Sequence, residues 1–178
     1  MTAVAWHVVT SLDGFVAAPG DDMSWIFEVI GPSETADEMV STTGAIVMGR
    51  RTYEVEDRDR PGIYGGAWNG SLFVLTHEAP ATVPGWMTGT FVHDGVGDAV
   101  GRAKTAAGDR NVGILGASIA RQCLDAGLLD EIVVQVAPVL LGDGVRMFDR
   151  PRSQQVKLEK AAVAESGQLT DLRFRVLR

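Results

Sequence analysis

The chain has 178 residues, a length typical of one domain, and we expect residues 1–178 to form a single unit. Hydrophobic residues make up 46% of the chain and charged residues 22%, which excludes a disordered chain and a membrane-embedded one. The net charge of −7 argues against nucleic acid as a partner, because that binding needs a basic surface. We therefore expect a soluble, cytoplasmic protein that binds no membrane and no nucleic acid.

Cysteine and histidine usage excludes several kinds of site. Cys123 is the only cysteine, so an internal disulfide and a cysteine-rich zinc site are both excluded. His7, His77 and His93 lack the spacing of metal ligands, and we expect no metal. A serine hydrolase is not expected either, because the chain has no G-x-S-x-G motif.

Short apolar runs alternate with helical segments along most of the chain, which predicts an α/β fold with a mainly parallel sheet. Near-continuous apolar runs favour strands that are covered on both faces. The expected strands are Val4–Thr10, Ala45–Met48, Ser71–Thr76, Thr90–His93, Val112–Leu115 and Ile132–Ala137. The expected helices are Ser33–Thr42, Gly97–Ala107 and Ser118–Ala126.

Two helix ends and the end of the chain carry further local signals. Ser33 is a candidate N-cap, and Gly127 follows a helix where a C-cap glycine is preferred. Alternating apolar and polar residues predict an antiparallel hairpin at a sheet edge, Val156–Glu165 with Thr170–Leu177. The irregular segment Glu56–Trp68 is either a lid or substrate loop, or a solvated connector.

Three strand ends have residues suited to an anion such as a phosphate, and two of them give the clearer signals. Gly116 separates a strand from a helix, and the amides of Ala117 to Ala120 lie at the helix start, although a plain tight turn would use the same residues. Gly49 is followed by Arg50 and Arg51, whose guanidinium groups are planar forks of donors, although a solvated basic turn is the alternative.

The third of these strand ends, and a fourth that carries Asp13, give weaker signals. Thr76 and His77 could contact a phosphate ester, but such residues are common at strand ends. Asp13 follows the first strand, and ligands in open α/β sheets bind just outside the carboxyl ends of strands. The Asp-Gly pair is also a common turn, so Asp13 is either a site residue or a turn former.

In chain order, these segments resemble the dihydrofolate-reductase-like superfamily, and most closely the RibD C-terminal-like reductase domain of bacterial riboflavin biosynthesis. The resemblance rests on TSLDGFVA, VMGRRTYE, GGAW, LFVLTH, ILGASIARQCLDAGLLDEIVV and APVLLGDGVRMF. It implies a mixed, mostly parallel sheet flanked by helices, with an antiparallel C-terminal strand. It also implies NADPH as the hydride donor and a homodimer.

The resemblance assigns roles to residues that the strand ends already singled out. The cofactor phosphates would be held by Gly49, Arg50, Arg51 and Thr52, with Thr76 and His77 near the adenosine 2′-phosphate. The pyrophosphate would lie against Leu115, Gly116, Ala117, Ser118, Ile119 and Ala120. Asp13 would be the catalytic residue near nicotinamide and substrate, and the residues expected to line the substrate site are Trp25, Tyr53 and Trp68.

The leading hypothesis is a NADPH-dependent reductase that transfers hydride to a C=O or C=N bond of a small polar substrate, such as a pyrimidine, a pterin or a sugar-like molecule. One alternative is a non-catalytic nucleotide-binding protein of the same fold, and another is a pterin or folate reductase. Dihydrofolate reductases have a carboxylate five residues after a loop tryptophan, whereas here Trp25 is followed at that distance by Ile30. Reduction of dihydrofolate is therefore not expected.

Overall fold

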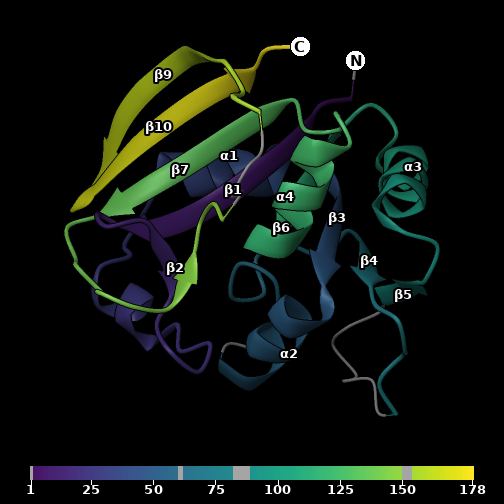
Figure 1. Cartoon of the computed structure of the whole chain (residues 1–178), viewed down its shortest axis with the longest axis horizontal. Helices are drawn as coiled ribbons and strands as arrows, with labels where there is room; N and C mark the ends of the chain where they lie inside the picture. The colour runs from purple at the N-terminus through teal and green to yellow at the C-terminus, as the bar shows by residue number, and fades with distance from the viewer. Residues whose placement is uncertain (1, 60–61, 82–88, 150–153) are drawn as a thin grey trace.

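The computed structural model describes residues 2–59, 62–81, 89–149 and 154–178. An eight-stranded sheet with the order β5-β4-β3-β6-β1-β7-β10-β9 forms the centre of the molecule (Figure 1). Its strands are β1 (Val4–Ser11), β3 (Thr43–Gly49), β4 (Ser71–Leu75), β5 (Gly89–Val92), β6 (Asn111–Leu115), β7 (Glu131–Ala137), β9 (Leu158–Ser166) and β10 (Leu169–Val176). The helices are η1, a 3₁₀ helix (Ser24–Glu28), α1 (Glu34–Thr42), α2 (Arg50–Asp59), α3 (Val96–Ala107) and α4 (Ala117–Asp125).

The sheet confirms the predicted fold class. Neighbouring strands from β5 to β7 are parallel, and β10 and β9 continue the sheet in antiparallel pairing. Each of the six predicted strands and three predicted helices is present, with ends shifted by at most two residues. The apolar runs were sufficient to locate the strands, because strands covered on both faces have few polar residues.

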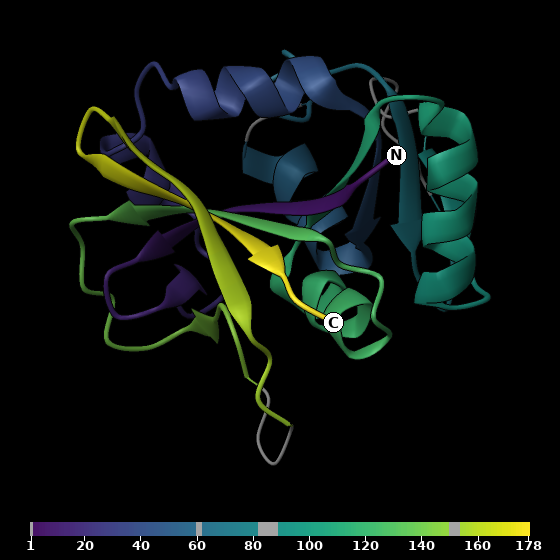
Figure 2. The ribbon, with the colours of Figure 1, turned by 90° about the horizontal axis from the view of Figure 1, so that it is seen from above.

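Helices cover both faces of the parallel strands, as Figure 2 shows from above. Val4 and Trp6 of β1 belong to the core that β1 forms with α3 and α4. The intervening Ala5 packs with Met39 of α1 on the opposite face. Because successive side chains of a strand point to opposite faces, β1 contributes to two separate hydrophobic layers.

The predicted helix ends are confirmed. The Ser33 hydroxyl accepts a hydrogen bond from the backbone N–H of Ala36 at 3.1 Å, which satisfies one of the donors that a helix start leaves free. Gly127 follows α4 with φ 66°, a left-handed conformation that costs glycine little.

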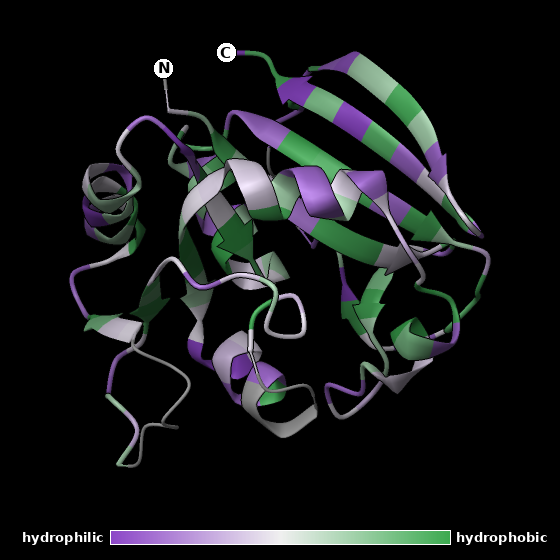
Figure 3. Ribbon diagram, turned by 180° about the vertical axis from the view of Figure 1, so that it is seen from behind, coloured by the Kyte–Doolittle hydropathy of each residue, from purple (hydrophilic) through white to green (hydrophobic). Residues whose placement is uncertain are grey.

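The C-terminal hairpin is also confirmed. β9 and β10 pair in antiparallel fashion, Gly167 has φ 62° in the connecting turn, and β10 pairs with β7. In Figure 3 hydrophobic and hydrophilic bands alternate along β10, whereas β9 has a continuous hydrophobic stretch at residues 161–164. β9 is the edge strand, and Leu158 to Glu165 are all exposed.

The prediction for the segment Glu56–Trp68 was wrong in part. α2 continues to Asp59, Ile63 and Trp68 are buried, and residues 60 and 61 lie outside the described residues. The segment that follows α2 is therefore packed against the sheet and is no solvated connector. The sequence also did not predict η1 or the small sheet of β2 (Phe15–Ala17) and β8 (Val145–Arg146). Within the described residues, no helix has the length and hydropathy needed to span a bilayer.

Candidate functional site

Two strand-to-helix corners lie side by side at the carboxyl edge of the sheet. β3 and β6 are neighbours, with Met48 paired to Leu115, and each strand continues through one glycine into a helix, α2 or α4. A Cβ atom on Gly49 would lie 3.3 Å from Ile119 Cγ1, and one on Gly116 would collide with the hydroxyl of Thr52. The glycines therefore allow the starts of α2 and α4 to interlock.

The charges at these two helix starts favour an anion. α1 and α3 each carry acidic residues in the first turn, which balance the positive end of the helix dipole, whereas α2 and α4 carry none. α4 also has no side-chain cap on its first amides, because its N-cap residue is Gly116. α2 begins with Arg50 and Arg51 instead, although cations are unfavourable next to a positive helix end. Adjacent helix starts with this charge distribution are suited to phosphate.

The end of β4 extends the same edge. Gly49 is paired with Leu75, so Thr76 directly follows the neighbouring strand end. Arg50 donates from Nη1 to the carbonyl oxygen of Glu78 at 2.8 Å and from Nε to Glu54 at 2.8 Å. The Thr76 hydroxyl donates to the same Glu78 carbonyl at 2.8 Å, and the His77 side chain is exposed. The structure thus brings Arg50 and Thr76 together at the Glu78 carbonyl, and the exposed His77 directly follows Thr76.

Arg51 is held by a carboxylate from a distant part of the chain. Its Nη2 donates to both oxygens of Asp21, at 2.5 and 2.6 Å, and its Nε donates to Oδ2 at 3.1 Å. These hydrogen bonds, followed by the charge of Asp21, raise the pKa of Arg51. The sequence did not predict Asp21 as part of this edge, because thirty positions separate it from Arg51.

Asp13 joins two loops at the carboxyl edge. Its carboxylate accepts hydrogen bonds from the Ser11 hydroxyl at 2.6 Å and from the backbone N–H groups of Leu141 at 3.1 Å and Gly142 at 2.7 Å. The Ser11 hydrogen bond is the largest cause that lowers the pKa of Asp13 to about 2. Asp13 is therefore ionised near neutral pH and is no proton donor there.

The three predicted substrate residues do not form one site: Tyr53 and Trp68 belong to one core cluster, and Trp25 belongs to another. Trp25 is buried in η1 against Ala137, the last residue of β7, and so lies near the carboxyl edge. Tyr53 points from α2 into the core and makes an edge-to-face contact with Phe91. Trp68 lies at the opposite edge, where its Nε1 donates to the carbonyl of Thr43 at 2.9 Å. Trp68 is therefore a core residue at the start of β3, and the prediction that it lines a site with Asp13 was wrong.

A buried polar network on the α1 face was not predicted from the sequence. Asp171 accepts from Gln135 Nε2 at 2.9 Å and from the Ser166 hydroxyl at 2.6 Å. Because the Gln135 amide nitrogen donates to Asp171, its oxygen accepts from His7 Nε2 at 3.0 Å, and His7 Nδ1 accepts from the Tyr64 hydroxyl at 2.8 Å. Burial lowers the pKa of His7, so the ring is neutral. The signal in the sequence was that His7 and Gln135 each interrupt an apolar strand.

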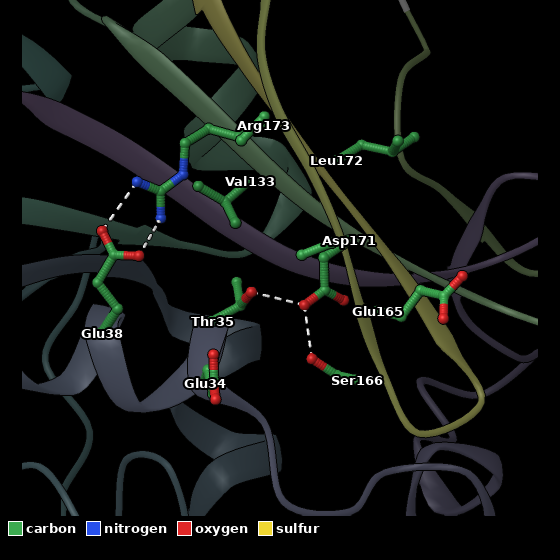
Figure 4. Close-up of a pocket in the computed structure, with 11 residues that line it drawn as sticks. Glu34, Thr35, Glu38, Val133, Glu165, Ser166, Asp171, Leu172 and Arg173 are labelled. Carbon is green, nitrogen blue, oxygen red and sulfur yellow. Dashed lines mark hydrogen bonds and ion pairs between the residues drawn. The ribbon is translucent and has the colours of Figure 1, made fainter.

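Two surface hollows lie away from the corners. One, of about 230 Å³, lies between α1 and the β9–β10 hairpin, where Arg173 donates two hydrogen bonds of 2.8 Å to Glu38 (Figure 4). The other, of about 370 Å³, lies beside Gly44 and Arg110 at the amino edge of the strands. Neither is lined by the corner glycines or by Asp13. Across the described residues, no three His, Cys, Asp or Glu side chains are grouped so as to hold a metal ion.

Comparison with known proteins supports the relationship inferred from the motifs. Residues 97–170 match the family model of the RibD C-terminal domain. Over 170 residues the chain is 24% identical to YwjB, an uncharacterized protein of Bacillus subtilis, and the alignment covers 94% of each chain.

Solved structures share the fold over nearly the whole chain. A protein named for riboflavin biosynthesis from Shewanella sp. PV-4 is 24% identical with a TM-score of 0.82, covering 99% of this chain and 100% of the other. RibD of Acinetobacter baumannii is 20% identical with a TM-score of 0.71, covering 99% of this chain and 58% of the other. The Thermotoga maritima diaminohydroxyphosphoribosylaminopyrimidine deaminase/5-amino-6-(5-phosphoribosylamino)uracil reductase is 17% identical with a TM-score of 0.69, covering 99% and 57%. The chain has the dihydrofolate-reductase-like fold of these proteins and spans little more than half of the last two.

Proposed function

We propose, from the RibD C-terminal domain match of residues 97–170 and the fold shared with RibD proteins, that the chain is a NADPH-dependent reductase. The observation that carries the proposal is the interlocked pair of corners at Gly49 and Gly116, where two helix starts without acidic first turns meet. The substrate would be a small polar molecule with a C=O or C=N bond, such as a pyrimidine, a pterin or a sugar-like compound.

Different residues at the carboxyl edge would contact different phosphate groups of the cofactor. The first amides of α4 and the hydroxyl of Thr52 would hold the pyrophosphate between the corners. Arg50, with Thr76 and His77 at the next strand end, would contact the 2′-phosphate, which distinguishes NADPH from NADH. When bound, NADPH supplies the hydride. The chain binds the cofactor, orients it and excludes water from the site.

Asp13 would position groups near the substrate and would not act as an acid. Its carboxylate holds the backbone of Leu141 and Gly142 against the turn after β1. With a pKa of about 2 it is unable to supply the proton that the reduced product requires near neutral pH, and we assign that proton to water.

A pterin or folate reductase is a less favourable assignment. Ile30, at the position where such enzymes have a carboxylate, packs with Trp25 and Ala137 in an apolar cluster. No proton could be relayed to a pterin from that position. Negligible turnover of dihydrofolate is therefore the expected result.

The cofactor assignment is tested by calorimetric titration of NADPH into the parent chain and into Arg50→Ala and Arg51→Ala. A charge-assisted hydrogen bond contributes about 1.5–3 kcal/mol, so we expect each variant to bind NADPH at least about tenfold more weakly. Arg102→Ala is the matched control, because Arg102 lies on α3 and pairs there with Asp98 at 2.8 Å. Parent-like affinity in both variants would exclude these arginines from the phosphate site.

A turnover assay separates the reductase from a non-catalytic nucleotide-binding protein. NADPH oxidation would be followed over a panel of carbonyl and imine compounds that includes aminopyrimidines. Substrate-dependent oxidation by the parent chain supports the reductase. Binding of NADPH without oxidation over the panel would favour the non-catalytic alternative.

A further inference from the structure

We propose that Asp21 is an internal competitor for the anion site at the start of α2 and thereby sets the affinity of the chain for phosphate. This inference rests on the proposed function, in which Arg51 contacts a cofactor phosphate. The Asp21 carboxylate accepts hydrogen bonds of 2.5, 2.6 and 3.1 Å from the Arg51 guanidinium, the group that would contact that phosphate. Phosphate and Asp21 are both anions, so they compete for the same donors.

The turn that presents Asp21 is locally well defined. The N–H of Ala18 donates to the carbonyl of Asp22 at 2.9 Å, and Gly20 and Asp21 have φ values of 81° and 58°. Two successive positive φ angles are typical of a tight hairpin turn, and aspartate is one of the few residues that tolerates the left-handed region. The N–H of Ser24 donates to Asp22 Oδ1 at 2.8 Å, which closes the turn on its other side. Asp21 is thus held near Arg51 by backbone structure.

The pair is placed so that a ligand can exchange with it. The Arg51 side chain is 74% exposed and that of Asp21 is 30% exposed, so the ion pair is hydrated and contributes little to stability. A phosphate has more charge and more acceptor oxygens than a carboxylate, and the planar guanidinium can bind either group. A phosphate would therefore displace Asp21 from Arg51. The free energy of phosphate binding would be less favourable by the free energy that the Asp21–Arg51 ion pair contributes.

Displacement also couples the cofactor to the 18–22 turn. Once phosphate occupies Arg51, Asp21 no longer accepts hydrogen bonds from that guanidinium and is repelled by the new anion. Phosphate binding at Arg51 and the conformation of the turn are then linked. If the turn lowers the affinity for phosphate, phosphate must destabilise the turn by the same free energy. We expect NADPH to increase hydrogen exchange of the amides in residues 18–24 of the parent chain.

The test compares NADPH, NADH and inorganic pyrophosphate binding to the parent chain and to Asp21→Asn by calorimetry. We expect Asp21→Asn to bind NADPH about two- to fivefold more tightly, the range that corresponds to an exposed ion pair. Asp109→Asn changes net charge equally at the opposite edge of the sheet, before β6, and should leave affinity unchanged. In an Arg51→Ala background, Asp21→Asn should no longer raise the affinity, because the donor for which Asp21 competes is gone.

Each outcome has one meaning for this inference. A gain for NADPH alone assigns Arg51 to the 2′-phosphate, a gain for both nucleotides assigns it to the pyrophosphate, and either supports competition by Asp21. Unchanged or weaker binding in Asp21→Asn, with no rise in hydrogen exchange of the parent turn, overturns it. Tighter binding of pyrophosphate without any binding of NADPH would uphold the role of Asp21 while excluding the NADPH-dependent reductase. Absence of binding by all three probes would exclude both.

Discussion

Asp13 illustrates how hydrogen bonds determine what a carboxylate can do. Three donors point at it, one hydroxyl and two backbone amides, and each favours the charged form. Its lowered pKa means that protonation would break contacts between the turn after β1 and the loop after β7. The folded state therefore gains stability from Asp13 wherever that carboxylate is charged.

This gives a pH-dependent prediction for Asp13→Asn. The folded-state pKa of about 2 lies below the ordinary value of 3.8, so the stabilisation is fully present above pH 3.8 and is lost as pH falls towards 2. We expect Asp13→Asn to lower the melting temperature at pH 7, and the difference from the parent chain to shrink between pH 3.8 and 2. Thermal unfolding followed by circular dichroism at several pH values measures this.

Asp143→Asn is the matched control, because Asp143 accepts a hydrogen bond only from its neighbour Gly144 among the described residues. A melting temperature of Asp13→Asn equal to that of the parent chain at pH 7 would contradict the anchoring role.

At the scale of elements, the two corners depend on each other. The turn from β6 to α4 needs a residue without a side chain, because Thr52 of α2 occupies the space next to Gly116. The positive φ of 91° adds a second requirement for glycine. The starts of α2 and α4 thus keep their relative position only while residue 116 is glycine.

We predict that Gly116→Ala destabilises the chain by more than Gly127→Ala. Both glycines have positive φ, but a Cβ on Gly127 would meet nothing within 4 Å, whereas one on Gly116 would collide with Thr52. Gly127→Ala should cost about 1–2 kcal/mol for the left-handed conformation alone, and Gly116→Ala should cost more. Urea unfolding measures the difference, and NADPH affinity should fall only in Gly116→Ala. Equal costs would show that the corners are not interlocked as described.

At the scale of the whole molecule, the outer edge of the sheet is a candidate for association. β9 has nine residues and is the last strand of the sheet (Figure 1). Its residues Ala161 to Ala164 are all exposed, and among them Val163 is 57% exposed. An edge strand presents unpaired N–H and C=O groups that can pair with another strand. We propose that two copies of the chain form a homodimer through β9.

Sedimentation of the parent chain should therefore give twice the chain mass of 19.0 kDa. Val163→Lys should raise the dissociation constant by at least about tenfold, because a lysine on an edge strand opposes pairing with another strand. Ala106→Lys, at an exposed position of α3, is the control and should remain dimeric. A parent chain that sediments as a monomer would contradict the proposal.

Much of the fold could be predicted because its signals are local. Apolar runs such as residues 45–48 and 112–115 are short and nearly free of polar residues, which predicts strands covered on both faces. Ser33 and Gly127 were predicted as caps from side-chain and backbone chemistry within one helical turn. The full length of α2 was missed because its outer half is strongly polar and has no apolar stripe to indicate a helix.

The candidate site was predictable where its residues follow strand ends, as at Gly49, Thr76 and Gly116, because parallel strands place their carboxyl ends together. The sequence by itself thus determined the class of fold, its anion-suited corners and its C-terminal hairpin. Only the tertiary structure decided that Asp21 lies on Arg51, that Asp13 holds the loop after β7, and that Trp68 lies at the opposite edge. Those contacts join segments 25 to 129 positions apart, and no local pattern of hydropathy or charge encodes which distant partner a polar side chain meets.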